Sequence, residues 1–591
     1  MKSSIRTALA AFAAFTVLAT TAQAKPGDLD LAFSFDGKVT TDFGGTSNAA
    51  YASAVQSDGK LIVAGSSTNG TQSKFAIVRY NIDGSYDGSF GTDGRVTTDF
   101  PNHVAVATTI AFRPAGNSIS QPAAIIVGGY SLDSGLYPDY DFALVRYNAA
   151  DGSLDTSFGG GDGKVTTNFE SIGTNSEDSD RITSMALQPV LFGYKIVVAG
   201  YAHGSETYPS STDFALARYL GSGALDTTFG TGGKVFTDFG GGSDRIIAMI
   251  LQEDGKILAG GQGYIAGAYR FLFCRYKTDG SLDGTFGSLG KVTIDFPGVS
   301  NAVCTGLTVL PGGKILAAGQ GTPDSSLLSR FHPDGSLDTS FGTGGIVVNS
   351  SGIARLFSVN SLAEQADGKI LLAGPVAIAG SVGSYDFGIV RYTANGALDK
   401  GFGTGGRATA NFGSTFNMLQ ELAIRSDGSI VAVGYHNTVT GSDFAVARFK
   451  TAQGDARIGL NASVPRGNDR YNTTGAGQTQ SVGIPCRGGT ETVVVGIQND
   501  TAAPDSFKIK GSAGNGKFKV KYLHGDTNVT TKVLNGTLTT GTLTSGAIYQ
   551  LKARVTATTS VKGKTRDFSI IPSSAADPTA KDRALIKATS R

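Results

Sequence analysis

The sequence predicts an all-β protein in which one four-stranded unit recurs seven times and a smaller β domain follows. The first observation is internal repetition: "FAIVRYNIDGSYDGSFGTDGRVTTDF" at 75–100 returns as "FALVRYNAADGSLDTSFGGGDGKVTTNF" at 142–169 and as "FALARYLGSGALDTTFGTGGKVFTDF" at 214–239. A fixed period of this kind indicates a repeat architecture. The second observation is composition, because 83 glycines and no tryptophan among 591 residues fit many short strands joined by tight turns.

Each repeat contains four strand-like runs. In the first repeat these runs are short, rich in β-branched or aromatic residues, and bounded by Gly, Asp and Asn, at 50–56, 60–66, 74–80 and 94–100. The sequence "SDGK" joins the first two runs and is typical of a β-hairpin. Four antiparallel strands repeated seven times predict a seven-bladed β-propeller over residues 25–455, with the first strand of each blade innermost.

An N-terminal strand is predicted to close the ring. The run "GKVTTDF" (37–43) precedes any first strand, whereas the seventh repeat stops at "FAVARF" (444–449) without a fourth strand. We therefore expect residues 37–43 to complete the last blade. Closure of this kind removes the open sheet edges that favour aggregation.

Residues 1–24 predict a secretory signal peptide. They begin with Lys2 and Arg6, continue with an apolar run, and end in "AQA", a small-residue cleavage site. No other segment is long and apolar enough to span a bilayer, so we expect an exported, soluble protein that is periplasmic, cell-surface or secreted. With only three cysteines the chain is not a disulfide scaffold; Cys274 and Cys304 either pair or remain reduced core thiols.

The charge is divided between two regions. Residues 456–591 hold 19 basic and 8 acidic residues, whereas residues 25–455 hold 29 basic and 40 acidic ones. This asymmetry predicts a domain boundary near Gly454 and different partners on its two sides. The tail also loses the repeat, and its alternating apolar and polar runs predict an immunoglobulin-like β-sandwich over 456–591.

Motifs of the forms "DGKIxxAG", "DFAxxRY" and "DGSLDxxFGxxGK" recur in order over residues 27–450. By these motifs the chain resembles the delta-60 repeat β-propeller family of exported bacterial proteins. The stretch "VVVGIQNDTAAPDSFKIKG" in the tail is similar to bacterial immunoglobulin-like modules. The family resemblance implies a propeller fold and implies no activity.

Repeated charges are predicted to be structural, because a catalytic centre needs different groups that converge on one reacting atom. The third strand of every repeat carries an arginine, and the "SLDTSF" turn carries a matching aspartate. We expect these to form charge-assisted pairs. No cofactor is predicted; calcium held by the "DGSLD" turns is the alternative that the carboxylates leave open.

Connections of variable length supply the candidate binding site. Loops on a rigid scaffold usually carry binding, and the connections at 131–141, 170–180 and 202–213 differ from their counterparts in length and composition. They combine aromatic and acidic side chains suited to a sugar or a cation. The predicted ligand-binding residues are Tyr137, Tyr140, Glu177, Asp178, Asp180, Glu206 and Tyr208.

These observations favour an exported, non-catalytic binding or structural protein over an enzyme. The propeller face is expected to bind an extracellular polymer or protein, and the basic tail an anionic polysaccharide; nucleic acid is not favoured. The alternative is a glycan- or ester-processing enzyme that uses carboxylates of 170–213. That alternative depends on analogy with other propellers alone.

Overall fold

The computed structural model describes residues 26–591 except 101–103, 116–121, 134–138, 170–179, 191–192, 204–210, 241, 323–324, 351, 353–355, 379, 451–454, 460–478, 487, 499–505, 526, 544–547 and 575–583. The predicted signal peptide lies outside this range. The described chain contains no helix of the length and apolar character that crossing a membrane requires.

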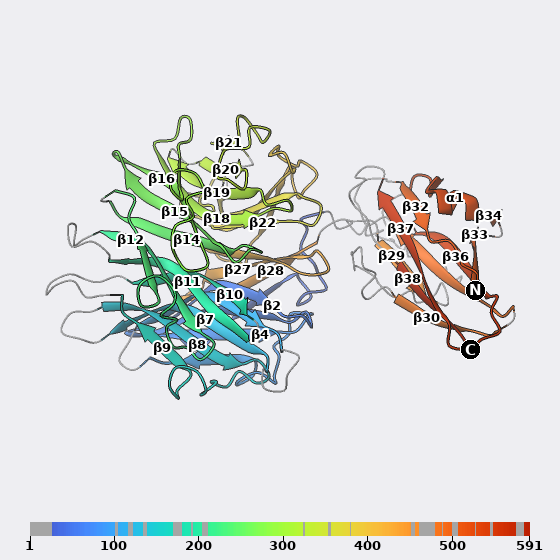
Figure 1. Ribbon diagram of the computed structural model, residues 1–591, viewed down its shortest axis with the longest axis horizontal. Coiled ribbons are helices and arrows are strands. Elements are labelled where there is room, and N and C mark those ends of the chain that lie inside the picture. Colours follow the sequence, from blue (N-terminus) through green and yellow to red (C-terminus); the bar gives the residue numbers. More distant parts are fainter. Residues whose placement is uncertain are drawn as a thin grey trace, which may run out of the picture.

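Seven four-stranded antiparallel sheets form the first body (Figure 1). The first three blades are β2 (Ser47–Val55), β3 (Leu61–Asn69), β4 (Gln72–Tyr80) and β5 (Arg95–Thr98); β6 (Ala105–Arg113), β7 (Ala124–Asp133), β8 (Asp139–Asn148) and β9 (Lys164–Thr167); and β10 (Arg181–Val190), β11 (Gly193–His203), β12 (Thr212–Leu220) and β13 (Lys234–Thr237).

The next three blades are β14 (Asp244–Leu251), β15 (Ile257–Ile265), β16 (Ala268–Tyr276) and β17 (Lys291–Ile294); β18 (Asn301–Val309), β19 (Ile315–Thr322), β20 (Ser325–Phe331) and β21 (Ile346–Asn349); and β22 (Ser361–Glu364), β23 (Ile370–Ala377), β24 (Tyr385–Tyr392) and β25 (Arg407–Ala410). The seventh blade is β26 (Asn417–Ile424), β27 (Ile430–Asn437), β28 (Ser442–Phe449) and β1 (Lys38–Thr41).

The N-terminal strand closes the ring as predicted. β1 pairs antiparallel with β28, with Lys38 opposite Ala447 and Thr41 opposite Phe444. The first strands of successive blades contact one another around the ring, and β26 contacts β2. The first strand of each blade is therefore innermost, and the seven-bladed prediction is confirmed.

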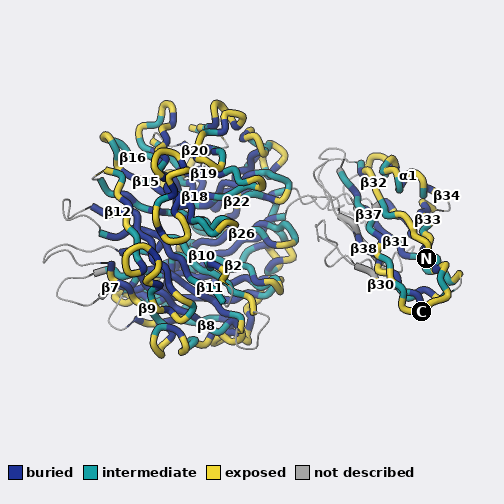
Figure 2. The backbone as a smooth tube through the Cα atoms, in the orientation of Figure 1, coloured by how far each residue is buried: buried dark blue, intermediate teal, exposed yellow. Residues whose placement is uncertain are grey.

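The core lies between neighbouring blades. In β3, Leu61 and Val63 pack toward the seventh blade, whereas Ile62 and Ala64 pack toward the second blade. A strand covered on both faces needs an almost continuous apolar run, as the repeat "KIxxAG" supplies. Figure 2 shows the buried central strands and the exposed turns at the rim.

The predicted arginine–aspartate pairs occur in every blade. In the third blade, Arg218 Nε lies 2.7 Å from Asp226 Oδ2, and its guanidinium also donates to the carbonyl of Thr278 in the next blade. In six of the seven pairs the guanidinium donates in this way to a backbone carbonyl of the next blade, so that the pair joins a strand, a turn and the neighbouring blade. The seven pairs, with Nε–Oδ2 distances of 2.6–2.8 Å, are Arg79–Asp87, Arg146–Asp155, Arg218–Asp226, Arg275–Asp283, Arg330–Asp338, Arg391–Asp399 and Arg448–Asp30.

Two five-stranded sheets form the second body, around one apolar core. One sheet has the order β29 (Asp455–Gly459), β31 (Thr490–Gln498), β36 (Ile548–Ala557), β33 (Phe518–His524) and β34 (Thr527–Asn528). The other has the order β30 (Thr479–Ile484), β38 (Ala584–Ser590), β37 (Thr565–Ser574), β32 (Phe507–Gly511) and β35 (Leu538–Thr539). One short helix, α1 (Thr530–Asn535), follows β34.

Cys274 and Cys304 are both free and buried. They lie in different core clusters, Cys274 with residues of the third and fourth blades and Cys304 with residues of the fourth and fifth. Burial raises the pKa of each thiol to about 12, so both stay protonated and behave as small apolar side chains. Of the two alternatives for this pair, the structure has the reduced one.

Candidate functional site

Two of the predicted ligand-binding residues lie in the described chain. Tyr140 is in β8, and Asp180 directly precedes β10. The other five, Tyr137, Glu177, Asp178, Glu206 and Tyr208, lie outside the described residues. The backbone N–H of Asp180 donates to the carbonyl of Tyr140 at 2.8 Å, so the two connections that contain these residues do meet.

Asp180 has a structural contact. Asp180 is 1% exposed, and its Oδ2 accepts a hydrogen bond from the backbone N–H of Phe169 at 2.7 Å. This bond fixes the end of the connection between the second and third blades.

Arg181, the next residue, lies between tyrosine rings. Its guanidinium carbon is 4.5 Å from the ring centroids of both Tyr130 and Tyr140, and those two rings meet edge to face at 5.3 Å. Arg181 is only partly buried, yet its Nε is buried without a hydrogen-bond partner. Within the described chain Arg181 forms no hydrogen bond through its side chain and no ion pair, so its guanidinium donors can bind a ligand.

Arg245 repeats this arrangement one blade further on. Its guanidinium carbon lies 4.7 Å from the ring centroid of Tyr201, and its buried Nε likewise has no partner. Strand pairing defines the equivalent positions in other blades, which carry Ala49, Val106, Val303 and Met418. Of the six positions compared, only those in the third and fourth blades carry an arginine, and the other four are neutral. The two arginines are therefore a departure from the repeat.

Two further tyrosines, in the seventh and first blades, lie next to these arginine–tyrosine contacts. Tyr51 occupies the bulge of β2, and its ring meets that of Tyr435 edge to face at 6.4 Å. Burial raises the pKa of Tyr51 to about 12, with smaller contributions from Tyr435 and Tyr130. The phenols thus remain neutral and can stack or donate hydrogen bonds. We call this set the mouth cluster: Tyr51, Tyr130, Tyr140, Arg181, Tyr201, Arg245 and Tyr435.

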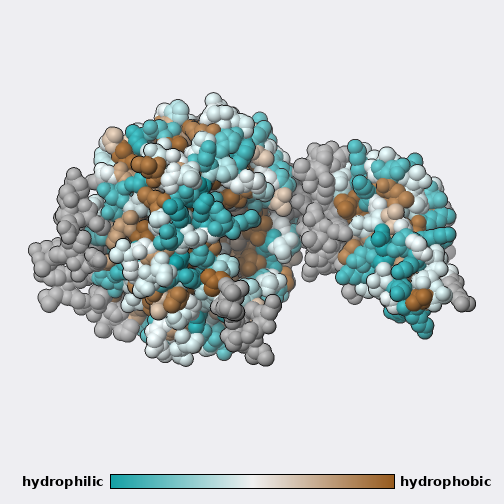
Figure 3. Space-filling view, viewed as in Figure 1, coloured by the Kyte–Doolittle hydropathy of each residue, from teal (hydrophilic) through white to brown (hydrophobic). Residues whose placement is uncertain are grey.

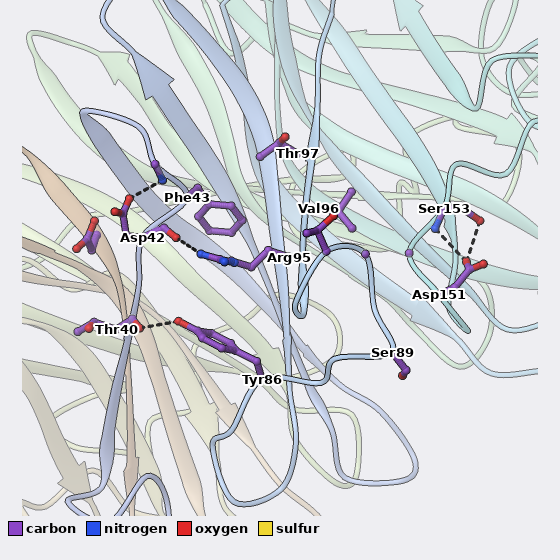
Figure 4. A pocket seen from close by; sticks show the side chains of 15 residues that line it. Thr40, Asp42, Phe43, Tyr86, Ser89, Arg95, Val96, Thr97, Asp151 and Ser153 are labelled. Atoms are coloured by element: carbon purple, nitrogen blue, oxygen red, sulfur yellow. Dashed lines mark hydrogen bonds between the residues drawn. The ribbon is translucent and has the colours of Figure 1, made fainter.

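A groove on the rim, of about 1140 Å³, is the competing candidate (Figure 4). It is open and lies where the first blade meets the closing strand. Its polar groups already bind one another: Arg95 donates to the backbone carbonyl of Asp42 at 2.7 Å, and the hydroxyl of Tyr86 donates to the backbone carbonyl of Thr40 at 3.1 Å. These bonds hold the seam of the ring, so we assign the groove a structural role.

The second body presents a basic face. Lys519 and Lys521 of β33 and Lys552 and Arg554 of β36 alternate with core residues and point away from the core. Lys521 lies directly opposite Arg554, and like charges in this position destabilise a strand pair. None of the four forms an ion pair with any residue that the structure describes. We call these four residues the basic face.

The view of Figure 3 shows hydrophobic residues as small separate areas within a largely hydrophilic surface. A polar or charged ligand suits this side of the molecule better than an apolar one does. Sequence reasoning named Tyr140 of the mouth cluster and missed both arginines. Alignment of the repeats by their second strands would have marked them, because neutral residues stand at the matching positions.

Comparison with known proteins identifies the repeats. A family described as a domain of unknown function (DUF5122) beta-propeller matches seven segments, at residues 56–90, 125–158, 195–229, 252–286, 310–341, 365–402 and 425–454. This chain belongs to that repeat β-propeller family. The predicted repeat-propeller membership is thereby confirmed, whereas the immunoglobulin-like module stays a prediction. No curated protein matches the chain.

Solved structures give only distant likenesses to this β-propeller protein. Virginiamycin B lyase from Staphylococcus aureus is 10% identical, with a TM-score of 0.36 over 69% of this chain and 98% of that one. The polysaccharide lyase Uly1 is 12% identical, with a TM-score of 0.39 over 73% and 98%. A glucose dehydrogenase is 10% identical, with a TM-score of 0.31 over 69% and 98%. Likenesses this distant say nothing about activity.

Proposed function

We propose that this protein is an exported, non-catalytic binding protein whose propeller holds an acidic extracellular polysaccharide at the mouth cluster. One observation carries the proposal: Arg181 and Arg245 are partly buried, lie on tyrosine rings, and lack anionic partners in the described chain. A guanidinium binds a carboxylate through two parallel hydrogen bonds, and a tyrosine ring packs against a sugar. The two arginines depart from the repeat, as a specific site requires.

The chemistry of the mouth cluster supports binding more than turnover. Burial raises the pKa of Tyr51, Tyr130 and Tyr435, which keeps these phenols neutral, and the charged groups of the cluster are guanidinium groups, which offer donors and no acceptor. Such groups orient an anion but do not abstract a proton at neutral pH.

We further propose that the second body is an immunoglobulin-like module that adds a second contact through the basic face. The strand order supports this: β29, β31, β36 and β33 form one sheet, and β32, β37 and β38 lie together in the other. This is the order of the seven-stranded immunoglobulin sandwich. Two weak contacts on one polymer raise the overall affinity when both engage together.

Calorimetry of the full mature chain with polygalacturonate tests the proposal. We expect binding that weakens with added salt, at least tenfold weaker binding for the double variant Arg181→Met/Arg245→Met, and little binding to neutral dextran. Arg95→Gln is the control, because it also replaces an arginine by a neutral residue but at the rim groove. This variant should bind polygalacturonate as the wild type does. Equal affinity of the double variant and wild type would refute the proposal. Shortening of the polymer during incubation would support the enzymatic alternative instead.

A further inference from the structure

Three aspartates meet at the junction of the third and fourth blades. Asp213 lies in β12, Asp238 directly follows β13, and Asp244 begins β14. One carboxylate oxygen of each lies within 4.8 Å of those of the other two. Asp213 and Asp244 are 3% and 1% exposed, whereas Asp238 is exposed.

The two buried carboxylates are poorly compensated. Oδ2 of Asp244 accepts the backbone N–H of Phe239 at 2.8 Å, but its buried Oδ1 has no hydrogen-bond partner. Asp213 makes neither a hydrogen bond through its side chain nor an ion pair with any part of the chain that the structure describes. A buried carboxylate without a partner is strongly unfavourable unless a cation or a proton neutralises it.

At the equivalent position between the seventh and first blades, the carboxylates do have hydrogen-bond donors. There the residues are Asp443, Asp42 and Asn48, and the amide of buried Asn48 donates to both carboxylates at 3.1 Å. Asn48 pairs with the second strand just as Asp244 does, one residue before the position of Arg245. At this junction an amide donor therefore occupies the position that Asp244 occupies at the junction of the third and fourth blades.

The junction of the sixth and seventh blades gives the same answer. Asn411 and Asn417 both donate to Asp386, at 2.5 and 3.1 Å. At the junction of the third and fourth blades, no side-chain amide among the described residues donates to the two buried aspartates. Lys291 does not replace it, because its Nζ donates to the backbone carbonyl of Asp238, as Lys234 does to that of Asn168 one blade earlier.

We propose that Asp213, Asp238 and Asp244 bind a divalent cation, with calcium the best match. Calcium takes oxygen ligands at about 2.3–2.6 Å, so two of its ligands lie at most about 5 Å apart, as the three carboxylates do. The exposed Asp238 leaves a side open for entry and for water ligands. Burial, and then the neighbouring carboxylates, raise the pKa of Asp213 to about 6 and that of Asp244 to about 7, while His203 and Lys291 oppose this. A bound cation would instead lower the pKa of both carboxylates.

This site is distinct from the mouth cluster and does not depend on the proposed polysaccharide. It also differs from the "DGSLD" turns, whose aspartates are engaged by the repeated arginines. The test uses the full mature chain stripped of metal and titrated with calcium chloride alone, by calorimetry and by thermal unfolding. We expect saturable heat and a higher melting temperature.

Asp244→Asn is the decisive variant because it installs the donor that Asn48 provides at its own junction. We expect it to weaken calcium binding at least tenfold and to melt, in chelator, at or above the wild-type temperature. Asp238→Asn changes an exposed ligand and gives the same loss of binding should Asp244→Asn fail to fold. Asp443→Asn is the matched control and should keep the calcium response. Absence of any divalent-cation response in the wild type, or an unchanged response in both site variants, would overturn the proposal.

Discussion

Asp30→Asn should release the strand that closes the ring. Asp30 and Arg448 form an ion pair in which Oδ2 lies 2.6 Å from Nε, and the side chains of Arg448 and Asp30 are 6% and 14% exposed. The variant leaves a buried guanidinium without its carboxylate, and removing one partner of a buried pair costs about 3–5 kcal/mol. Because β1 is attached to its blade only through non-covalent contacts, we expect this cost to appear as local opening of 38–41 rather than only as global unfolding.

A loss of about 3 kcal/mol corresponds to a roughly 100-fold increase in the open population. Amide hydrogen exchange resolved by mass spectrometry measures this directly, since β1 donates and accepts hydrogen bonds along β28. We expect protection of residues 38–41 in Asp30→Asn to fall by that factor.

Asp399→Asn is the control, because its pair with Arg391 is nearly identical at 2.8 Å, with side chains 6% and 16% exposed. There the fourth strand, β25, is continuous in the chain with β24 of its own blade. This variant should destabilise the propeller without exposing residues 38–41. Unchanged exchange at 38–41 in Asp30→Asn, or an equal increase in Asp399→Asn, would refute the reasoning.

Two further predictions concern the contacts between blades. Glu421 of β26 lies beside Ser53 of β2 in the neighbouring blade, and burial raises the pKa of Glu421 from 4.5 to about 7. The contribution of Glu421 to stability is therefore full below about pH 4.5 and is lost as the pH rises through 7. Glu421→Gln should therefore gain up to about 3 kcal/mol over the wild type between pH 5 and 8, measured by denaturant unfolding at both values; parallel pH dependences would contradict this. Tyr147→Phe removes the 2.6 Å hydrogen bond to buried Thr98 and should cost about 1–2 kcal/mol in the same assay. Tyr269→Phe, at a half-buried tyrosine of the fourth blade whose hydroxyl has no hydrogen bond to the described chain, should cost less. Equal losses in these two variants would show that the bond between blades contributes nothing of its own.

The repeat made the architecture predictable. Blade number, closure by 37–43 and the arginine–aspartate pairs all follow from features that recur in each copy, so seven copies reinforce one interpretation. The mouth arginines do not recur, and their meaning depends on the register that places Arg181 opposite Tyr201. The aspartate cluster is harder still, because Asp213, Asp238 and Asp244 come from two blades and meet only when the ring forms.

The basic face was predictable only in part. Alternation marks Lys519 and Lys521 as outward-facing, and the charge asymmetry of the tail marks the region as basic. Which strand lies beside them is a matter of sheet order, and that order brings Arg554 opposite Lys521. Non-local pairing of this kind is not encoded in the spacing of the residues along the chain.

A structure of residues 25–591 with a short oligogalacturonate would show whether the polymer binds at the mouth cluster. We expect a uronate carboxylate within hydrogen-bond distance of the guanidinium of Arg181 or Arg245, with a sugar ring against Tyr130, Tyr140 or Tyr201. An oligosaccharide bound in the rim groove beside Asp42 and Arg95, with the mouth cluster unchanged from the free protein, would contradict this expectation.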